Sequence, residues 1–375
     1  MVRAIVPDHL RSSSRIDPAD GHMMRPKVFI IAMVKPLPLF KPEAANWLSK
    51  DSEVSFTRTV PLLGLSRAYD TIHCTEDGSV CLMTAGTGLI NAALSVSALT
   101  SSSRFDLSKS YFILSGIAGV NPRVSTIGAV TFAKFAIQVD TQMEWDGRDI
   151  PSSWSTGYVP MGAPSPESFP RYIHGTEVFE LNDDLRQIVM SFARNADLED
   201  SEEAAKYRAK YPGAADDMYR AATSKPCVTE GDVLSSNVFW HSYRLSEAMA
   251  HVAKVYTSGQ ANYVMTAQED SAILAALLRA ALQHKVDFSR IILMRSGSNF
   301  DREPPGSELP ELPFVLDHGG LQPSLRNLYL SGVRVIEGIL KGWTTTFERG
   351  VAATNYFGDV LGSLGGLPDF GPCNS

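Results

Sequence analysis

Residues 80–88 have the sequence VCLMTAGTG, an apolar segment of strand length that runs directly into two glycines. The next segment, 89–99, has the length and alanine content of a helix, so strand, glycine turn and helix follow one another as in an α/β sheet. Further strand-like segments occur at 27–33, 111–114, 128–132, 263–266 and 290–295, and helical patterns at 181–220, 271–283 and 325–340. This alternation predicts a three-layer α/β sandwich with a central mixed, partly curled sheet.

The length of the chain is sufficient for one large hydrophobic core, since 44% of its 375 residues are apolar. We expect a single domain over residues 27–375, with a lid-like insertion near 145–170, where Pro, Ser and Gly are frequent. Residues 1–26 contain scattered charges and no continuous apolar segment of the kind found in secretory signals. We interpret them as a disordered leader.

The charge balance provides no electrostatic reason to bind nucleic acid or an anionic membrane, because the net charge is −7 and the pI is about 5.7. No segment approaches the roughly 18 to 20 apolar residues that a bilayer-spanning helix requires. We therefore expect neither a nucleic-acid partner nor insertion into a membrane.

The four cysteines are Cys74, Cys81, Cys227 and Cys373, and none of them belongs to a C-x-x-C pair. This spacing argues against a zinc site, and so few cysteines argue against a disulfide scaffold. We expect a reduced, cytoplasmic protein without a metal. One alternative stays open, namely that Cys74 and Cys81 face each other across a hairpin around Asp77-Gly78.

Four polar or glycine-rich clusters follow predicted strands, at residues 84–88, 115–119, 268–270 and 296–301. In an open α/β sheet the carboxyl ends of the strands form the edge at which ligands bind. Each cluster also has a structural interpretation. Gly86 and Gly88 either relieve a tight turn or present backbone N–H groups to a ligand.

The acidic pair Glu269-Asp270 begins an otherwise apolar helix. It either caps that helix or accepts hydrogen bonds from a sugar diol. Asn299 and Asp301 either serve turn geometry or contact a base nitrogen. The aromatic cluster at 239–241 either stacks on a flat ring or belongs to the core.

Six stretches carry a resemblance to a known family: PKVFIIAM, TAGTGLINAALSVSALTSS, SGIAGVNPRVSTIGAV, HGTEVFELNDDL, MTAQEDSAILAAL and RSGSNFDREPPG. Together they run from Pro26 to Gly306 and resemble the fungal and bacterial purine nucleoside permeases. That family is similar in turn to the purine nucleoside phosphorylases and the methylthioadenosine/adenosylhomocysteine nucleosidases. The resemblance implies a nucleoside phosphorylase-like fold, a purine nucleoside ligand, no cofactor, and a homodimer or higher homo-oligomer.

The resemblance also implies roles for individual residues. Glu269 matches the Glu that holds the ribose hydroxyls in the wider superfamily, with Gln268 in place of its preceding Met. Ser298-Asn299 is similar to the Ser-Asp pair whose acid serves N7 of the purine. Asn299 donates a hydrogen bond but no full proton, so Asp301 becomes the candidate that restores the acid.

The base and phosphate subsites follow by the same comparison. Phe239 and Trp240 lie in SSNVFW, which resembles the segment whose aromatic side chain stacks on the base. Residues 113–119 contain no arginine before Gly116 and resemble the nucleosidases, which use water. Since a guanidinium supplies the strongest hydrogen bonds to phosphate, hydrolysis is favoured, with phosphorolysis through Arg67 or Arg123 as the alternative.

The last group expected in the site is a general base that activates water. The nucleosidases carry their water-activating Glu in Ala-Met-Glu-Glu after the first strand, whereas this chain has Ala-Met-Val-Lys there. The next acid is Glu43, which we expect to deprotonate the water while Asn299 and Asp301 take the charge that arrives at N7. A different class also stays open, a non-catalytic nucleoside-binding protein that assists uptake.

Overall fold

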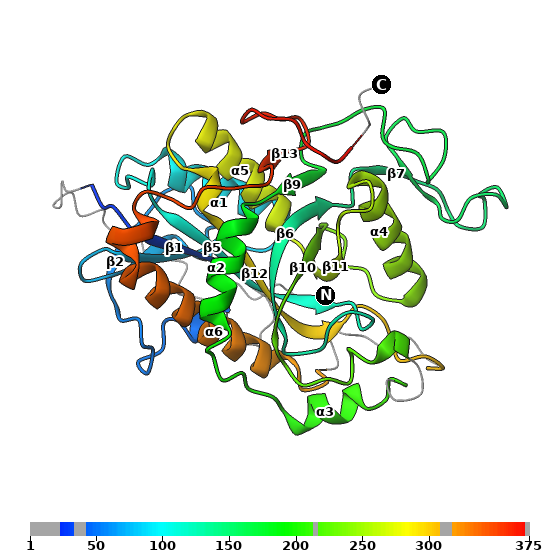
Figure 1. Cartoon of the computed structure of the whole chain (residues 1–375), viewed down its shortest axis with the longest axis horizontal. Coiled ribbons are helices and arrows are strands. Elements are labelled where there is room, and N and C mark those ends of the chain that lie inside the picture. Colours follow the sequence, from blue (N-terminus) through cyan, green and yellow to red (C-terminus); the bar gives the residue numbers. More distant parts are fainter. Residues whose placement is uncertain (1–22, 34–42, 213–216, 308–316, 372–375) are drawn as a thin grey trace, which may run out of the picture.

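The computed structural model describes residues 23–33, 43–212, 217–307 and 317–371. Most of the expected leader, residues 1–22, lies outside the described residues. Its end is joined to the body of the protein, because Met24 forms an isolated β-bridge with Phe105. The described chain is a mixed sheet between two layers of helices, which confirms the three-layer α/β prediction (Figure 1).

Thirteen strands and six α-helices make up the described chain. The strands are β1 Val28–Ala32, β2 Phe56–Pro61, β3 Thr71–Thr75, β4 Val80–Thr84, β5 Tyr111–Val120, β6 Val130–Gln138, β7 Gln142–Glu144, β8 Tyr158–Pro160, β9 Val178–Glu180, β10 Val228–Ser235, β11 Tyr263–Ala267, β12 Ile291–Phe300 and β13 Gly358–Asp359. The helices are α1 Gly88–Ser101, α2 Asp183–Ala193, α3 Glu202–Arg208, α4 Tyr243–Tyr256, α5 Asp270–Leu282 and α6 Leu321–Lys341.

The centre of the sheet is β1, which pairs in parallel with β4 on one side and β5 on the other. All five of its residues are buried, because helices cover both faces of the sheet. A continuous apolar strand is the pattern expected in that position. The main sheet has eleven strands in the order β13-β9-β6-β10-β11-β5-β1-β4-β3-β2, with β12 bridging β5 and β6.

The sheet closes on itself where β12 joins β5 to β6, because β6, β10, β11, β5 and β12 then form one circuit. Both β5 and β12 are longer than the sequence predicts and continue to Val120 and Phe300. Their second halves find partners within this circuit, which a local pattern does not reveal. Gly297 permits the close approach, since a Cβ there would lie 1.9 Å from the side chain of Val120.

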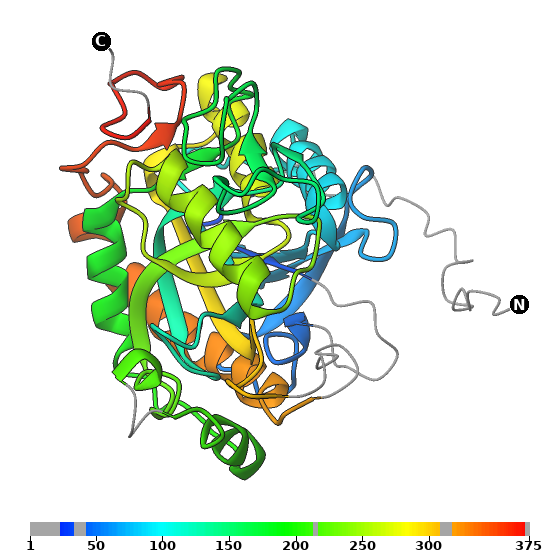
Figure 2. The same ribbon diagram turned by 90° about the vertical axis from the view of Figure 1, so that its right-hand side faces the viewer.

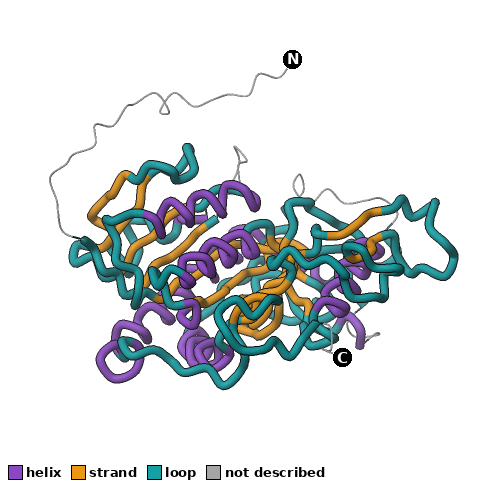
Figure 3. Tube along the Cα trace, turned by 90° about the horizontal axis from the view of Figure 1, so that it is seen from above, coloured by secondary structure: helices purple, strands orange, loops and turns teal. Residues whose placement is uncertain are grey.

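Helices cover the two faces of the sheet, as Figure 3 shows from above. One apolar cluster joins α1 and α5 to one face, and another joins α2 and α6 to the opposite face. A third cluster packs α4 against the barrel-like end, in front of the strands in Figure 2. The part of the chain that the structure describes contains no helix long and apolar enough to cross a membrane.

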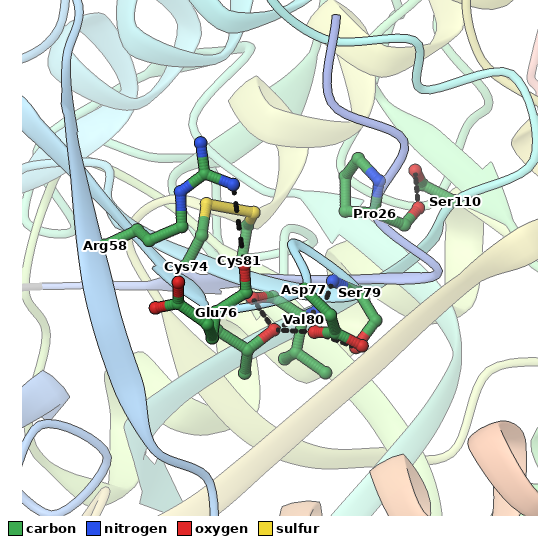
Figure 4. The surroundings of a disulfide bond; sticks show 10 residues. Pro26, Arg58, Cys74, Glu76, Asp77, Ser79, Val80, Cys81 and Ser110 are labelled. Atoms are coloured by element: carbon green, nitrogen blue, oxygen red, sulfur yellow. Dashed lines mark hydrogen bonds between the residues drawn. A yellow bond between two sulfur atoms is a disulfide. The ribbon is translucent and has the colours of Figure 1, made fainter. Parts of the chain in front are cut away.

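The hairpin of β3 and β4 carries a disulfide bond between Cys74 and Cys81 (Figure 4). The two residues lie opposite each other in the antiparallel pair, and both are fully buried. The turn between them is held by Asp77, which accepts hydrogen bonds from Ser79 and Thr75. The alternative in which these cysteines face each other is therefore the one that the structure has.

The proline-rich segment near 145–170 includes the loop between β7 and β8, which form a separate two-stranded sheet. This hairpin lies beside α4, and the two border an open cleft with an empty volume of about 1750 Å³. None of the site residues expected from the sequence lines that cleft.

Candidate functional site

A cavity opens where the carboxyl ends of β5, β10 and β11 meet the closing strand β12. It has an empty volume of about 520 Å³, part of which is open to solvent. Its lining residues are Glu43, Ile117, Ala118, Gly119, Val238, Phe239, Trp240, Thr266, Ala267, Gln268, Glu269 and Ser298.

Glu43 enters the cavity from a short 3-10 helix, Glu43–Ala45. The segment is anchored by the fully buried Trp47, whose ring packs edge-on against Tyr329 at 5.2 Å between centroids. The carboxylate accepts a hydrogen bond from the N–H of Met33 at 3.1 Å and from that of Ile117 at 3.3 Å. These two strand amides orient an acidic side chain that is 6% exposed.

Glu269 enters the same cavity from the start of α5 and is 5% exposed. Its Oε1 accepts a hydrogen bond from the N–H of Gly88 at 3.1 Å. Gly86 and Gly88 both have positive φ angles, +89° and +81°, so the turn before α1 needs glycine at each position. Burial raises the pKa of the Glu269 carboxyl, against the opposing effect of Arg295. Neither glycine lines the cavity, and the N–H of Gly88 binds the Glu269 carboxylate, so the turn positions this carboxylate and does not itself face a ligand.

Arg295 lies directly behind the cavity and is 1% exposed. It comes from the middle of β12, where it is in register with Gly116 of β5. A Cβ at Gly116 would lie 2.3 Å from one guanidinium nitrogen and 3.1 Å from Oε2 of Glu43. A guanidinium from the neighbouring strand therefore lies beside Gly116.

The segment after β10 contributes Val238, Phe239 and Trp240 to the cavity lining, and Trp240 is also part of the core cluster that packs against α4. Gln268 is fixed there, since its side-chain amide donates to the carbonyl of Asn237 at 3.1 Å. Ser298 also lines the cavity, and its hydroxyl donates to the side-chain oxygen of Asn299 at 3.0 Å. Asn299 follows a bulge in β12 and donates to the carbonyl of Phe300 at 2.9 Å.

Asp301 does not line the cavity. Its carboxylate accepts two hydrogen bonds from Arg302, at 2.8 and 3.1 Å, and one from the hydroxyl of Tyr263 at 2.5 Å. Both Asp301 and Arg302 are buried. The structure therefore engages the expected acid in an internal ion pair, away from the residues that it was expected to join.

The two alternative phosphate ligands also lie outside the cavity lining. Arg67 is exposed, and Arg123 forms an ion pair with Glu247 at 2.9 Å. Among the described residues, no group of three or more His, Cys, Asp or Glu side chains could hold a metal ion.

Arg295 and Thr266 are the functional positions that sequence reasoning missed. An arginine at the end of the apolar segment RIILMR needs a carboxylate if it is buried, because guanidinium groups are rarely buried without a partner. That signal, together with the acidic pair at 269–270, was sufficient to connect β12 with the start of α5. Thr266, whose hydroxyl accepts from the N–H of Gly119 at 3.2 Å, gave no comparable signal.

Solved structures that resemble this chain are nucleosidases. They include the 5′-methylthioadenosine/S-adenosylhomocysteine nucleosidase of Neisseria meningitidis, with a TM-score of 0.47, 15% identity, and coverage of 83% of this chain and 99% of that one. A futalosine hydrolase of Helicobacter pylori has a TM-score of 0.47 and 14% identity, and the match covers 84% of this chain and 98% of that one.

The sequence comparisons are more specific. The family model for purine nucleoside permease (NUP) matches residues 25–352. A purine nucleoside permease of Candida albicans is 38% identical over 353 residues, which cover 92% of this chain and 83% of the relative. A relative in Schizosaccharomyces pombe is 34% identical, over 86% of this chain and 91% of its own length. The chain therefore belongs to the purine nucleoside permease family.

Proposed function

We propose that this protein binds a purine nucleoside in the cavity and cleaves its N-glycosidic bond by hydrolysis, releasing base and ribose. The observation that carries the proposal is the pair of buried carboxylates, Glu43 and Glu269, that enter one cavity from separate elements. The aromatic wall at Phe239 and Trp240 provides a surface on which a purine can stack. To bind and hydrolyse a nucleoside, a site needs three elements: an acceptor for the ribose diol, a base that activates water, and a flat apolar wall for the purine.

The roles follow from the charge that develops during cleavage. Breaking the bond places positive charge on the ribose and negative charge on the departing purine. Glu269 accepts hydrogen bonds from the ribose hydroxyls, and its negative charge stabilises the cationic sugar. Glu43 takes a proton from the attacking water. Asn299, the expected donor to N7, does not line the cavity, and its side-chain amide donates to the carbonyl of Phe300, so the proposal gives a role to neither Asn299 nor Asp301.

The charges around the cavity favour water over phosphate. Arg295 is surrounded by carboxylates of Glu43, Glu269 and Asp270, which together exceed its single positive charge. A phosphate dianion entering such a pocket would lose hydration without gaining a net positive partner. A neutral water molecule carries no such penalty.

The proposal is tested with inosine, adenosine and guanosine in phosphate-free buffer, by measuring free base and free ribose. Full activity without phosphate supports hydrolysis, whereas a reaction that needs phosphate and yields ribose 1-phosphate contradicts it. Binding without any product would instead favour a nucleoside-binding protein that assists uptake, as the family description allows.

Glu43→Gln should abolish turnover while nucleoside binding is retained, because only the proton acceptor is lost. Glu177→Gln is the matched control. Glu177 is also a buried glutamate bound by backbone N–H groups, of Gly175 and Thr176, but it does not line the cavity. Equal loss of activity in the two variants would count against a role of Glu43 as base.

A homodimer or higher oligomer and a cytoplasmic location stay predictions. The disulfide between Cys74 and Cys81 bears on the second of these. Disulfides persist mainly in oxidising compartments, so the redox state of Cys74 and Cys81 in cells is the measurement that tests the cytoplasmic location.

A further inference from the structure

The guanidinium of Arg295 lies below the floor of the cavity and is not available to bind an anion. Arg295 approaches Gly116 of β5 and donates to the carbonyl of Ile117 at 3.2 Å. Ile117 and Glu269, both contacted by Arg295, line the cavity, so the charge lies one atomic layer below its surface. An unpaired arginine in this place would be a strong ligand for phosphate.

Asp270 binds two guanidinium nitrogens of Arg295 and is therefore its main counter-ion. One carboxylate oxygen accepts from Nε of Arg295 at 3.1 Å, and the other accepts from a terminal nitrogen in a close contact. Glu269 adds a longer contact of 3.4 Å to the same terminal nitrogen. Asp270 is 0% exposed, so the pair is closed to solvent.

A role as helix cap does not account for this orientation. Asp270 is the first residue of α5, where an acidic side chain commonly complements the helix dipole. Here both of its oxygens bind Arg295 on the neighbouring strand instead. The carboxylate is directed at the guanidinium rather than at the helix N–H groups.

We propose that Asp270 is a specificity-determining residue, which withholds Arg295 from inorganic phosphate and so keeps the cavity selective for water as the second substrate. The inference rests on the proposed function, since it explains why a cavity with an arginine below its floor does not support phosphorolysis. Removing the Asp270 charge leaves the guanidinium of Arg295, next to the cavity lining, without its two-point counter-ion, so that its positive charge can attract a phosphate.

The test is phosphate binding by Asp270→Asn, measured by calorimetry and by thermal melting in phosphate against sodium chloride of equal ionic strength. The unaltered protein should show no binding at millimolar phosphate. The variant should show measurable binding at the same phosphate concentrations, with a gain in affinity of at least about tenfold, because a charged contact has become available to phosphate. Adding Arg295→Gln to this variant should abolish the gain.

Glu269→Gln is the matched control, because it removes a carboxylate with a longer contact to the same guanidinium. Its gain in phosphate affinity should be smaller than that of Asp270→Asn. If Asp270→Asn does not fold alone, Asp270→Ala supplies a second variant, and phosphate but not chloride should restore its folding. Failure of phosphate to restore either variant would overturn the inference, as would phosphate binding by the unaltered protein.

These measurements need no turnover, so they separate the inference from the proposed function. A protein that cleaves no nucleoside but gains phosphate binding through Asp270→Asn would refute hydrolysis and leave the role of Asp270 standing. Ribose 1-phosphate formed by the variant alone would support both.

Discussion

Two buried arginines, Arg295 within β12 and Arg302 just beyond its end, have similar surroundings and different consequences. Each guanidinium binds an aspartate through two nitrogens and also contacts a glutamate. At Arg295 the glutamate is Glu269, which lines the cavity. At Arg302 it is Glu247 of α4, which borders the wide cleft instead.

The comparison shows that a buried arginine paired with carboxylates does not by itself form a ligand-binding site. Asp301 is saturated by Arg302 and Tyr263, and the cluster attaches α4 to the sheet. The Arg295 cluster leaves the Glu269 carboxylate at the cavity surface, where a ligand can reach it. We therefore expect substitutions at Arg302 and its partners to change stability, and substitutions around Arg295 to change ligand chemistry.

The largest effect is expected from Asp301→Ala, which leaves the buried Arg302 without its main counter-ion. Breaking a buried pair from one side costs about 3–5 kcal/mol of the free energy of unfolding. Urea denaturation measures this loss, and the nucleoside affinity of the folded fraction should stay within about twofold. A stable variant that loses only turnover would reverse the comparison and restore Asp301 as the acid.

Glu269→Gln should lower kcat/KM at least about tenfold, since charged hydrogen bonds to the ribose diol contribute roughly 1.5–3 kcal/mol each. Its melting temperature should change less than that of Asp301→Ala, because Arg295 keeps Asp270 as its partner. Steady-state kinetics and thermal melts on the same preparation measure both. Unchanged kinetics would leave Glu269 as a purely structural group.

The pH dependence distinguishes the two clusters further. Burial raises the pKa of Glu269, so its carboxylate forms only above the pH expected of an ordinary glutamate. The acid limb of kcat/KM should lie correspondingly high and should move in Glu269→Gln, where only the limb of the Glu43 base remains. The stability contribution has the opposite sign: it is fully present below the unfolded-state pKa and is lost as the pH rises through the raised folded-state pKa. An acid limb that stays at the same pH in Glu269→Gln would assign it to another group.

The smallest effect is expected from Arg123→Ala. Arg123 pairs with Glu247 at 2.9 Å, and both side chains are partly exposed, so the pair contributes less than about 1 kcal/mol to stability. Nucleoside cleavage should be unchanged and equally independent of phosphate. Loss of a phosphate-dependent reaction in this variant would revive Arg123 as a phosphate ligand.

Much of the fold follows from local pattern. The predicted strand at 80–84 agrees with β4, and the predicted helix at 271–283 agrees with α5 within one residue at each end. The edge strand β2, the short strand β9 and helix α4 were not predicted, and β3 was expected only in the alternative of a hairpin around Asp77-Gly78. Their burial alternates or depends on distant partners, so a short window of sequence carries little information about them.

The sequence by itself determined the α/β class and the family, and it nominated Glu43, Glu269, Phe239, Trp240 and Ser298, which all line one cavity. Only the tertiary structure decided which charges meet. It engaged Asp301 with Arg302, joined Cys74 to Cys81, and placed Arg295 against Gly116 with Asp270 across its guanidinium. The physical reason is that the closure of β12 onto β5 and β6 sets these neighbours, and strand pairing over long sequence separations leaves no local trace.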